Sequence, residues 1–296
     1  MATPTRLSRQ EIVDKLEEFP TLPTVIYELS NVINNPMSSA TDVEKIMSND
    51  VSLTTKVLKL ANSAYYAIPG GVTSLSRAIS YLGFDTVNQL VLSASILNAL
   101  EFEGDAPFDM NDFWKHCIAV GIASETIAKA TNHPLPSDMF TCGLIHDMGK
   151  VAYLTLDAPS VLAISSLAKS EGISYLEAET KLEFERHTTV GHLLAEKWQL
   201  PVQLQSVVLY HHEKNPDKRN YLSADLHQAV DIVYLANVFV HALKFGDAGH
   251  SKVYGMPKDV LERLAIDAKE GYKKILLEIN TAIGRADEFI KIIGGS

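Results

Sequence analysis

The 296-residue chain is poor in cysteine and contains no long apolar run. Its two cysteines, Cys117 and Cys142, are too few for a disulfide framework, and we interpret them as buried thiols of a reducing compartment. The longest apolar stretch, residues 90–100, is interrupted by three polar residues and falls short of the roughly 20 apolar residues that a membrane span needs. Residues 1–10 hold no apolar core of a secretory signal. We therefore expect a cytoplasmic protein without a membrane-embedded segment.

Positive charge is also scarce. The chain has 26 lysine and arginine residues against 36 aspartate and glutamate residues, which gives a formal net charge of −10 at pH 7. Nucleic acids and anionic membranes attract a basic surplus, so neither is expected as a partner. Lys56, Lys59 and Arg77 could form a small basic patch, but solvated helix faces explain them better. The hydrophobic share of 46% is ordinary for a folded protein and argues against long disorder.

The apolar pattern of the sequence is mainly that of helices. Within residues 22–33 the apolar side chains recur with the i, i+3, i+4, i+7 spacing of an amphipathic helix, and no segment of the chain shows convincing period-2 alternation. We predict an all-α fold. The polar linker at residues 103–109 is the best internal boundary, which predicts an N-terminal helical lobe over residues 1–104 and a second helical lobe over residues 105–215. Residues 216–296 are predicted to complete the second lobe as a C-terminal helical extension.

The ten histidines are unevenly placed. Taken singly, each has an ordinary explanation as a core-edge residue, a helix cap or a surface residue. Their order along the chain indicates more, because the groups fall on different predicted helices, and ligands on facing helices that converge on a bundle core can build a metal site. Imidazole and carboxylate ligands suit Fe, Mn, Ni or Zn better than Ca. The candidate ligands are His116, His146, Asp147, His187, His211, His212 and Asn237.

The sequence also separates these candidates from other histidines. The segment HDMGK at residues 146–150 lies on a predicted helix with Gly143 and Gly149, whose small size permits close approach by neighbouring helices. His192 follows His187 by five residues, which is about 140° around a helix, so the two cannot share a site on one straight helix. The remaining histidines have no motif context and are interpreted as surface residues: His133, His227, His241 and His250.

This order of residues resembles the HD superfamily of metal-dependent phosphohydrolases, and is closest to its HD-GYP branch and to the related HDOD family. Residues 22–92 are similar to the HDOD signature in their LP opening, in DVSLTTKVLKLANSA and in SRAISYLGFDTVNQLVL. The resemblance covers roughly residues 14–215. It implies an HDOD-type fold in which the second lobe is HD-like, and a regulatory role in bacterial signal transduction.

The resemblance also implies roles for the candidate ligands. His116, the His146–Asp147 pair and the later histidines correspond to metal ligands of the superfamily, and Lys150 corresponds to a lysine near the substrate phosphate. In an active enzyme Asp147 would bridge two ions, and Lys150 would neutralise charge on the phosphoryl oxygens. Two departures weaken this chemistry. No Gly-Tyr-Pro sequence follows the paired histidines, and the last aspartate ligand is replaced by the neutral Asn237.

Two functional interpretations follow. The first is a bacterial regulatory module that binds a signalling protein or a small phosphorylated effector and keeps the metal site, with one or two divalent ions, Fe or Mn in preference to Zn or Ni. The second is a metal-dependent phosphohydrolase of a nucleotide or phosphodiester, in which Asp147 and Lys150 are catalytic. A plainer interpretation keeps the helical fold but treats the histidines as core and surface residues without a metal. The oligomeric state stays open.

Overall fold

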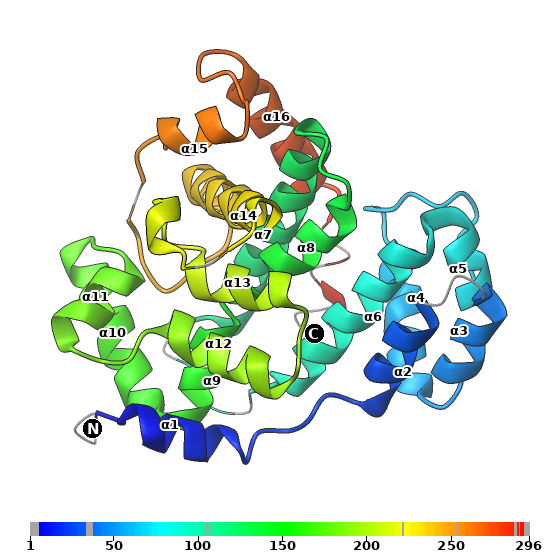
Figure 1. Cartoon of the computed structure of the whole chain (residues 1–296), viewed down its shortest axis with the longest axis horizontal. Coiled ribbons are helices and arrows are strands. Elements are labelled where there is room, and N and C mark those ends of the chain that lie inside the picture. The colour runs from blue at the N-terminus through cyan, green and yellow to red at the C-terminus, as the bar shows by residue number, and fades with distance from the viewer. Residues whose placement is uncertain are drawn as a thin grey trace. The chain divides into compact units, whose positions relative to one another are not determined.

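The computed structural model describes residues 6–33, 38–102, 104, 106, 108–220, 222–252, 254–286, 289, 291 and 292. Within these residues every regular element is a helix, which confirms the predicted all-α fold (Figure 1). The chain divides into two compact units. The smaller unit comprises residues 20–101 and the described residues from Thr281 onward, and the larger unit comprises the described residues up to Phe19 and from Phe102 to Asn280.

The smaller unit is built from helices that pack mainly on their neighbours along the chain. Asp50 caps one of them, because its Oδ1 atom accepts a hydrogen bond from the backbone nitrogen of Leu53 at 2.9 Å. Asn62 then holds the following turn through two hydrogen bonds with the backbone of Val72. The helices of this unit are α2 (Thr24–Ile33), α3 (Ala40–Met47), α4 (Val51–Ala61), α5 (Leu75–Leu82) and α6 (Phe84–Ala99).

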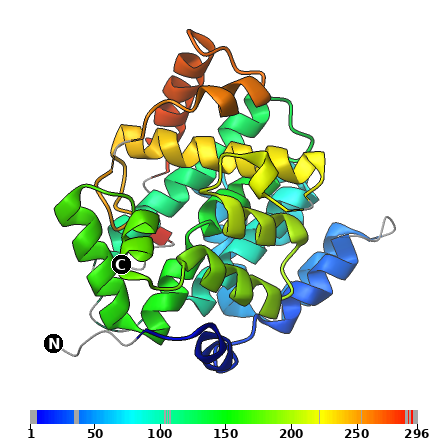
Figure 2. The same ribbon diagram turned by 60° about the vertical axis from the view of Figure 1, so that its left-hand side comes forward.

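The core of the larger unit lies between α7, α8 and α14, which both views show side by side (Figures 1 and 2). A second layer is formed by α9, α12 and α13, in which α12 packs on both of the others. The elements of this unit are α1 (Arg9–Leu16), α7 (Met110–Ala130), α8 (Pro136–Ile145), α9 (Met148–Leu156), α10 (Ala158–Glu171), α11 (Tyr175–Leu182), α12 (His187–Lys197), α13 (Val202–Tyr210), a 3-10 turn (Pro216–Lys218), α14 (Ala224–Leu243), α15 (Lys258–Arg263) and α16 (Gly271–Ile283), which reaches the boundary between the units.

Two glycines set the closest helix contacts of the larger unit. A Cβ atom on Gly143 of α8 would lie 2.6 Å from the carbonyl oxygen of Val120 in α7. A Cβ atom on Gly149 of α9 would lie 1.9 Å from the carbonyl oxygen of His187 in α12. No side chain fits at either position, so the expectation that Gly143 and Gly149 permit close approach is confirmed. The contact at Gly149 holds the first turn of α12 against the first turn of α9.

Each end of the chain belongs to a different unit from the lobe in which it is predicted. The internal boundary falls within three residues of the predicted one. The segment up to Phe19 belongs with the larger unit, because the ammonium group of Lys197 at the end of α12 donates a hydrogen bond to the carbonyl oxygen of Phe19 at 3.2 Å. From Thr281 onward the chain belongs with the smaller unit, where the Phe289 ring lies 6.0 Å from the ring of Tyr65.

Helix α14 is long and apolar enough to cross a membrane by length and composition, and it is the one such helix among the described residues. It packs against α7, α8 and α13. Its Asp231 accepts hydrogen bonds from the buried Arg219 at 2.6 Å and from Arg263 at 2.7 Å. The apolar side chains of α14 therefore contribute to the core of the larger unit, and the helix carries Asn237 into that core.

Candidate metal centre

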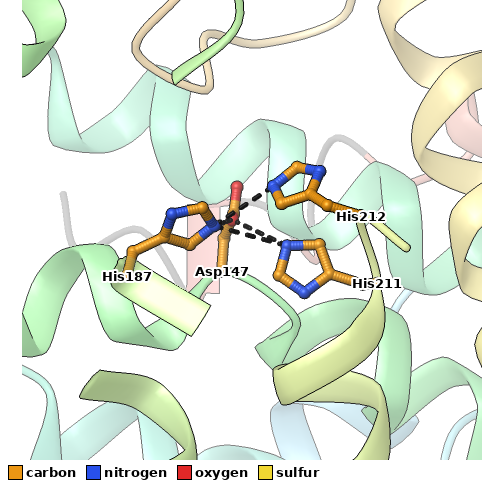
Figure 3. A group of neighbouring side chains, drawn as sticks. All are labelled: Asp147, His187, His211 and His212. Atoms are coloured by element: carbon orange, nitrogen blue, oxygen red, sulfur yellow. Dashed lines mark hydrogen bonds and ion pairs between the residues drawn. The ribbon is translucent and has the colours of Figure 1, made fainter. Parts of the chain in front are cut away.

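A cluster of acidic and imidazole side chains gathers in the larger unit from segments far apart in the sequence (Figure 3). Asp147 lies in the turn between α8 and α9, His187 is the first residue of α12, and His211 and His212 follow the end of α13. The Oδ1 atom of Asp147 lies 3.3 Å from His187 Nε2 and 3.4 Å from His211 Nε2. The Nε2 atoms of His187 and His212 are 3.2 Å apart. One donor atom from each of the four residues lies within 4.8 Å of the other three.

Asp147 also belongs to a second group of donor atoms, together with His116 of α7 and His146. Its other carboxylate oxygen, Oδ2, lies 3.3 Å from His146 Nε2, and the ring centres of His116 and His146 are 5.6 Å apart. Every member of both groups is buried except His212, which is half-buried. The structure thus brings six of the seven predicted ligands into two groups that share Asp147.

Backbone carbonyl groups orient two of the imidazole rings. The Nδ1 atom of His146 donates to the carbonyl oxygen of Gly143 at 2.7 Å, and the Nδ1 atom of His211 donates to that of Val208 at 3.0 Å. Because a carbonyl oxygen only accepts, these Nδ1 atoms carry a proton, and each Nε2 atom faces the cluster. Hydrogen bonds of this kind fix the tautomer of metal-ligating histidines.

Glu179 of α11 orients a third ring, and no motif in the sequence singles it out. Its fully buried carboxylate accepts hydrogen bonds from the backbone nitrogen of His187 at 2.7 Å and from its Nδ1 atom at 2.9 Å. Burial would lower the pKa of His187, but Glu179 and the contact with Asp147 raise it above its usual value. The sequence signal for Glu179 is its place four residues after Tyr175, on the buried face of a short helix.

Burial and neighbouring charge set the protonation of the other groups. Burial lowers the pKa of His211 to about 4, and burial together with neighbouring histidines lowers the pKa values of His116 and His212 well below the usual value. Burial would raise the pKa of Asp147, but the Lys150 ammonium holds it well below its usual range. His116, His211 and His212 therefore offer neutral imidazole nitrogens beside the ionised carboxylate of Asp147, which is the protonation state that metal binding requires.

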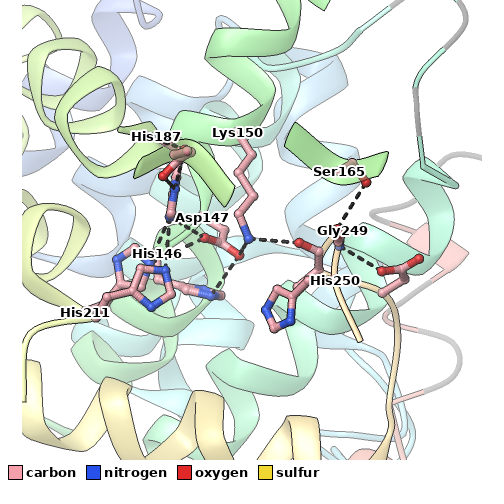
Figure 4. A network of polar contacts seen from close by, with 12 residues as sticks. His146, Asp147, Lys150, Ser165, His187, His211, Gly249 and His250 are labelled. Carbon is pink, nitrogen blue, oxygen red and sulfur yellow. Dashed lines mark hydrogen bonds and ion pairs between the residues drawn. The ribbon is translucent and has the colours of Figure 1, made fainter. Parts of the chain in front are cut away.

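Lys150 is enclosed by the protein (Figure 4). Its Nζ atom lies 2.6 Å from Asp147 Oδ2 and 2.9 Å from the carbonyl oxygen of Ala248, and it lies over the ring of Tyr175 at 4.7 Å from the ring centre. The side chain is 1% exposed. The geometry makes Lys150 a counter-ion of Asp147, and the contact with a substrate phosphate that the resemblance implies stays a prediction.

Asn237, the seventh predicted ligand, lies on α14 and is buried. Its Oδ1 atom has no hydrogen-bond partner among the described residues. One turn later on the same helix, the ring of His241 lies 4.7 Å from the ring of His116, and the ring of His250 follows at 4.5 Å from that of His241. A row of imidazole rings therefore extends from His116 of α7 through His241 of α14 to His250 in the following loop.

The interpretation of His241 and His250 as surface residues is wrong, because His250 is buried and His241 is half-buried. The loop after α14 folds back onto α7, where the backbone nitrogen of Asp247 donates to the carbonyl oxygen of Asp112 at 3.0 Å. The apolar periodicity of α14 does not predict that the loop after this helix folds back onto α7. The other two histidines interpreted as surface residues are buried or half-buried as well, and they are His133 and His227.

The donor set fits a transition-metal ion. Buried polar atoms without partners are rare, because each costs about 1–3 kcal/mol. A cation would satisfy such nitrogen and oxygen atoms, and their mixture of imidazole and oxygen donors suits Fe, Mn, Zn or Ni. Around the cluster, the buried side-chain atoms with no hydrogen-bond partner among the described residues are His116 Nε2, His146 Nε2, Asp147 Oδ1, Asn237 Oδ1 and His241 Nε2.

Known proteins share this architecture. The HDOD domain family matches residues 19–214, so the chain belongs to the HDOD family. The crystal structure of an HDOD domain protein of unknown function from Geobacter sulfurreducens has a TM-score of 0.77 at 23% identity, and the match covers 96% of this chain and 98% of that chain. The crystal structure of a Shewanella amazonensis SB2B protein, provisionally described as a phosphohydrolase, has a TM-score of 0.68 at 24% identity and covers 96% of each chain.

A curated relative extends these similarities to a longer protein. An uncharacterized protein of Treponema pallidum (strain Nichols) is 26% identical over 211 residues, which make up 71% of this chain and 40% of that protein. The chain therefore spans less than half the length of this relative. The similarity to the two crystal structures supports the shared all-helical fold, and the resemblance to the HDOD family that the sequence indicates is confirmed.

Proposed function

We propose that this chain is a cytoplasmic, bacterial regulatory HDOD module that binds a signalling protein or a small phosphorylated effector, and that its buried cluster holds one or two divalent transition-metal ions. The observation that carries the proposal is the burial of the donor set. An ion enclosed by the protein is better suited to joining helices than to contacting a phosphoester substrate. The members that are at most 1% exposed are His116, His146, Asp147, His187 and His211.

An ion in the first group would be held by residues from the turn between α8 and α9, the start of α12 and the end of α13, and an ion in the second group by residues from α7 and the same turn. Either ion would supply the positive charge that joins the segments of its own group. Asp147 is present in both donor groups, so a second ion would share this carboxylate. We propose Fe or Mn ahead of Zn or Ni, because the set mixes imidazole with carboxylate. The neutral Asn237 brings less charge than a carboxylate would, which favours one tightly held ion over two.

Metal analysis of the purified, untagged protein by inductively coupled plasma mass spectrometry tests the metal site. We expect about one equivalent of Fe or Mn in the wild-type protein and less in the double variant His146→Ala/Asp147→Ala, which should also have a lower Tm. His227→Ala is the matched control, because His227 is a half-buried histidine of the same unit outside both donor groups. Equal metal contents in the wild type and the double variant would contradict the assignment of the site.

A second measurement separates binding from turnover. Metal-loaded protein is incubated with bis(p-nitrophenyl) phosphate, a general phosphodiester probe. We expect no more p-nitrophenol from the wild type than from the double variant, because the buried donor set leaves little room for an ester. Release of p-nitrophenol by the wild type alone would favour the enzymatic alternative.

That alternative is a metal-dependent phosphohydrolase, and one observation favours it. Asp147 belongs to both donor groups, as a bridging carboxylate of a two-metal site does. Two features weigh against it. Lys150, which would neutralise phosphoryl charge, already pairs with Asp147 and with the Ala248 carbonyl group. Asn237 brings no negative charge to the position where an aspartate ligand is expected.

A further inference from the structure

Lys150 and Asp147 form an ion pair in the interior of the larger unit. The Nζ atom lies 2.6 Å from Asp147 Oδ2, and both side chains are 1% exposed. The same ammonium group donates to the carbonyl oxygen of Ala248 at 2.9 Å and lies over the ring of Tyr175. An ammonium group has three N–H donors, and the hydrogen bonds to Asp147 and Ala248 use two of them. The ammonium group of Lys150 is therefore bound by groups of the protein interior.

The ion pair balances charge without a metal. A buried carboxylate is strongly unfavourable unless a cation or hydrogen-bond donors compensate it. The cluster contains two buried carboxylates, and each has its own cationic or donor partner. Glu179 accepts two hydrogen bonds from His187, and Asp147 is paired with Lys150. Each of these two buried carboxylates therefore has a partner before any ion enters.

We propose that Lys150 is a resident counter-cation that competes with the metal ion for Asp147 and so weakens metal binding. This inference rests on the proposed function, because it concerns the same metal site. An incoming divalent ion must share the Asp147 carboxylate with an ammonium group that lies 2.6 Å from it, and two cations in a buried site repel each other strongly. Lys150 thus lets the protein stay folded without metal and take up an ion reversibly, as a metal-responsive regulator requires.

The polar contacts of Lys150 reach beyond the cluster (Figure 4). Ala248 and Gly249 belong to the loop that follows α14, and the carbonyl oxygen of Gly249 accepts a hydrogen bond from Ser165 Oγ at 3.1 Å. The hydrogen bond from Lys150 to Ala248 is another of the contacts that hold this loop. An ion that displaces Lys150 from Asp147 removes or weakens that contact. Metal occupancy is thereby coupled to the attachment of the loop.

The test compares metal-stripped wild type, Lys150→Met and Lys273→Met, each titrated with Mn²⁺ by isothermal titration calorimetry. Lys150→Met removes the charge, keeps a flexible apolar stem of similar length and leaves every predicted ligand in place. Lys273 is the matched control, because it pairs with Glu270 at the same three-residue helical spacing, at 2.8 Å, but on the surface. We expect Lys150→Met to bind Mn²⁺ at least about tenfold more tightly than wild type. Lys273→Met should stay within about twofold of wild type.

Stability gives a second readout. Without metal, Lys150→Met leaves Asp147 buried and without its counter-ion, so its Tm should fall by roughly 5–15 °C. Added Mn²⁺ should then raise the Tm of this variant more than that of the wild type. If Lys150→Met does not fold, Lys150→Gln takes its place in both measurements, because it removes the charge and retains a hydrogen-bond donor.

The outcomes distinguish this inference from the proposed function. If the wild type binds Mn²⁺ and Lys150→Met binds it equally or more weakly, the counter-cation role is overturned and the metal site stands. A merely structural role for Lys150 gives that result, because damage to the cluster lowers metal affinity and does not raise it. If none of the proteins takes up Mn²⁺, the metal site itself is overturned, together with the competition for Asp147.

Discussion

The substitution Gly149→Ala tests how the candidate metal centre is held together. An added Cβ atom would lie 1.9 Å from the carbonyl oxygen of His187 and 2.7 Å from the backbone nitrogen of Gly191. Ordinary contact begins at 3.4 Å, so α12 must move away from α9 by about 1.5 Å at His187. Both obstacles are backbone atoms, and no side-chain rotation relieves them. The two helices must separate.

The size of the effect follows from this movement. Overpacking of this kind typically costs about 1–3 kcal/mol, and the upper part of the range applies where the backbone has to shift. For a protein of this size each kcal/mol lowers the Tm by roughly 2–4 °C, so we expect a fall of about 5–10 °C. The movement also takes His187 Nε2 away from Asp147 Oδ1, from which it lies 3.3 Å. Metal affinity should therefore fall by roughly 10–100-fold.

Scanning calorimetry and metal analysis of the same preparations measure both effects. Gly255→Ala is the control, because a Cβ atom on Gly255 meets no atom within 4 Å, and it should change neither quantity. A Gly149→Ala protein with the Tm and the metal content of the wild type would refute the reasoning. A lower Tm with full metal content would show that the contact between α9 and α12 stabilises the unit without positioning His187.

Three further predictions concern charge. Glu179→Gln removes the carboxylate that orients His187, and we expect about 10–100-fold weaker Mn²⁺ binding in a calorimetric titration; unchanged affinity would contradict this role. In metal-free protein, burial lowers the pKa of His211 from 6.5 to about 4, so the unfolded state binds more protons between these values. The free energy of unfolding should therefore fall by up to about 1.4 kcal/mol per pH unit for this residue as the pH drops from 6.5 toward 4, and urea titrations at several pH values measure the slope. Asp231→Asn leaves the buried Arg219 without its carboxylate partner and should lower the free energy of unfolding by about 3–5 kcal/mol, whereas an unchanged urea midpoint would show that the pair contributes little.

The sequence by itself determined the helical fold and the chemical identity of the donors. Helix formation depends on residues within one or two turns of each other, so apolar periodicity and caps such as Asp50 are readable from a local stretch of sequence. The donor atoms belong to residue types, and their order along the chain was enough to select His116, His146, Asp147 and the later histidines, which the structure brings together. The close approach at Gly149 was equally readable, because only glycine lacks a side chain.

Only the tertiary structure decided how these donors are partnered. The hydrogen bond between Lys150 and Ala248 joins residues 98 positions apart, and the return of the loop after α14 buries His250. The contact between Lys197 and Phe19 likewise decides which unit the start of the chain joins. Such contacts depend on how all the helices of a core pack together, and no local pattern encodes that packing. Lys150, for which the family resemblance implies a contact with a substrate phosphate, is paired in the folded chain with the buried carboxylate of Asp147.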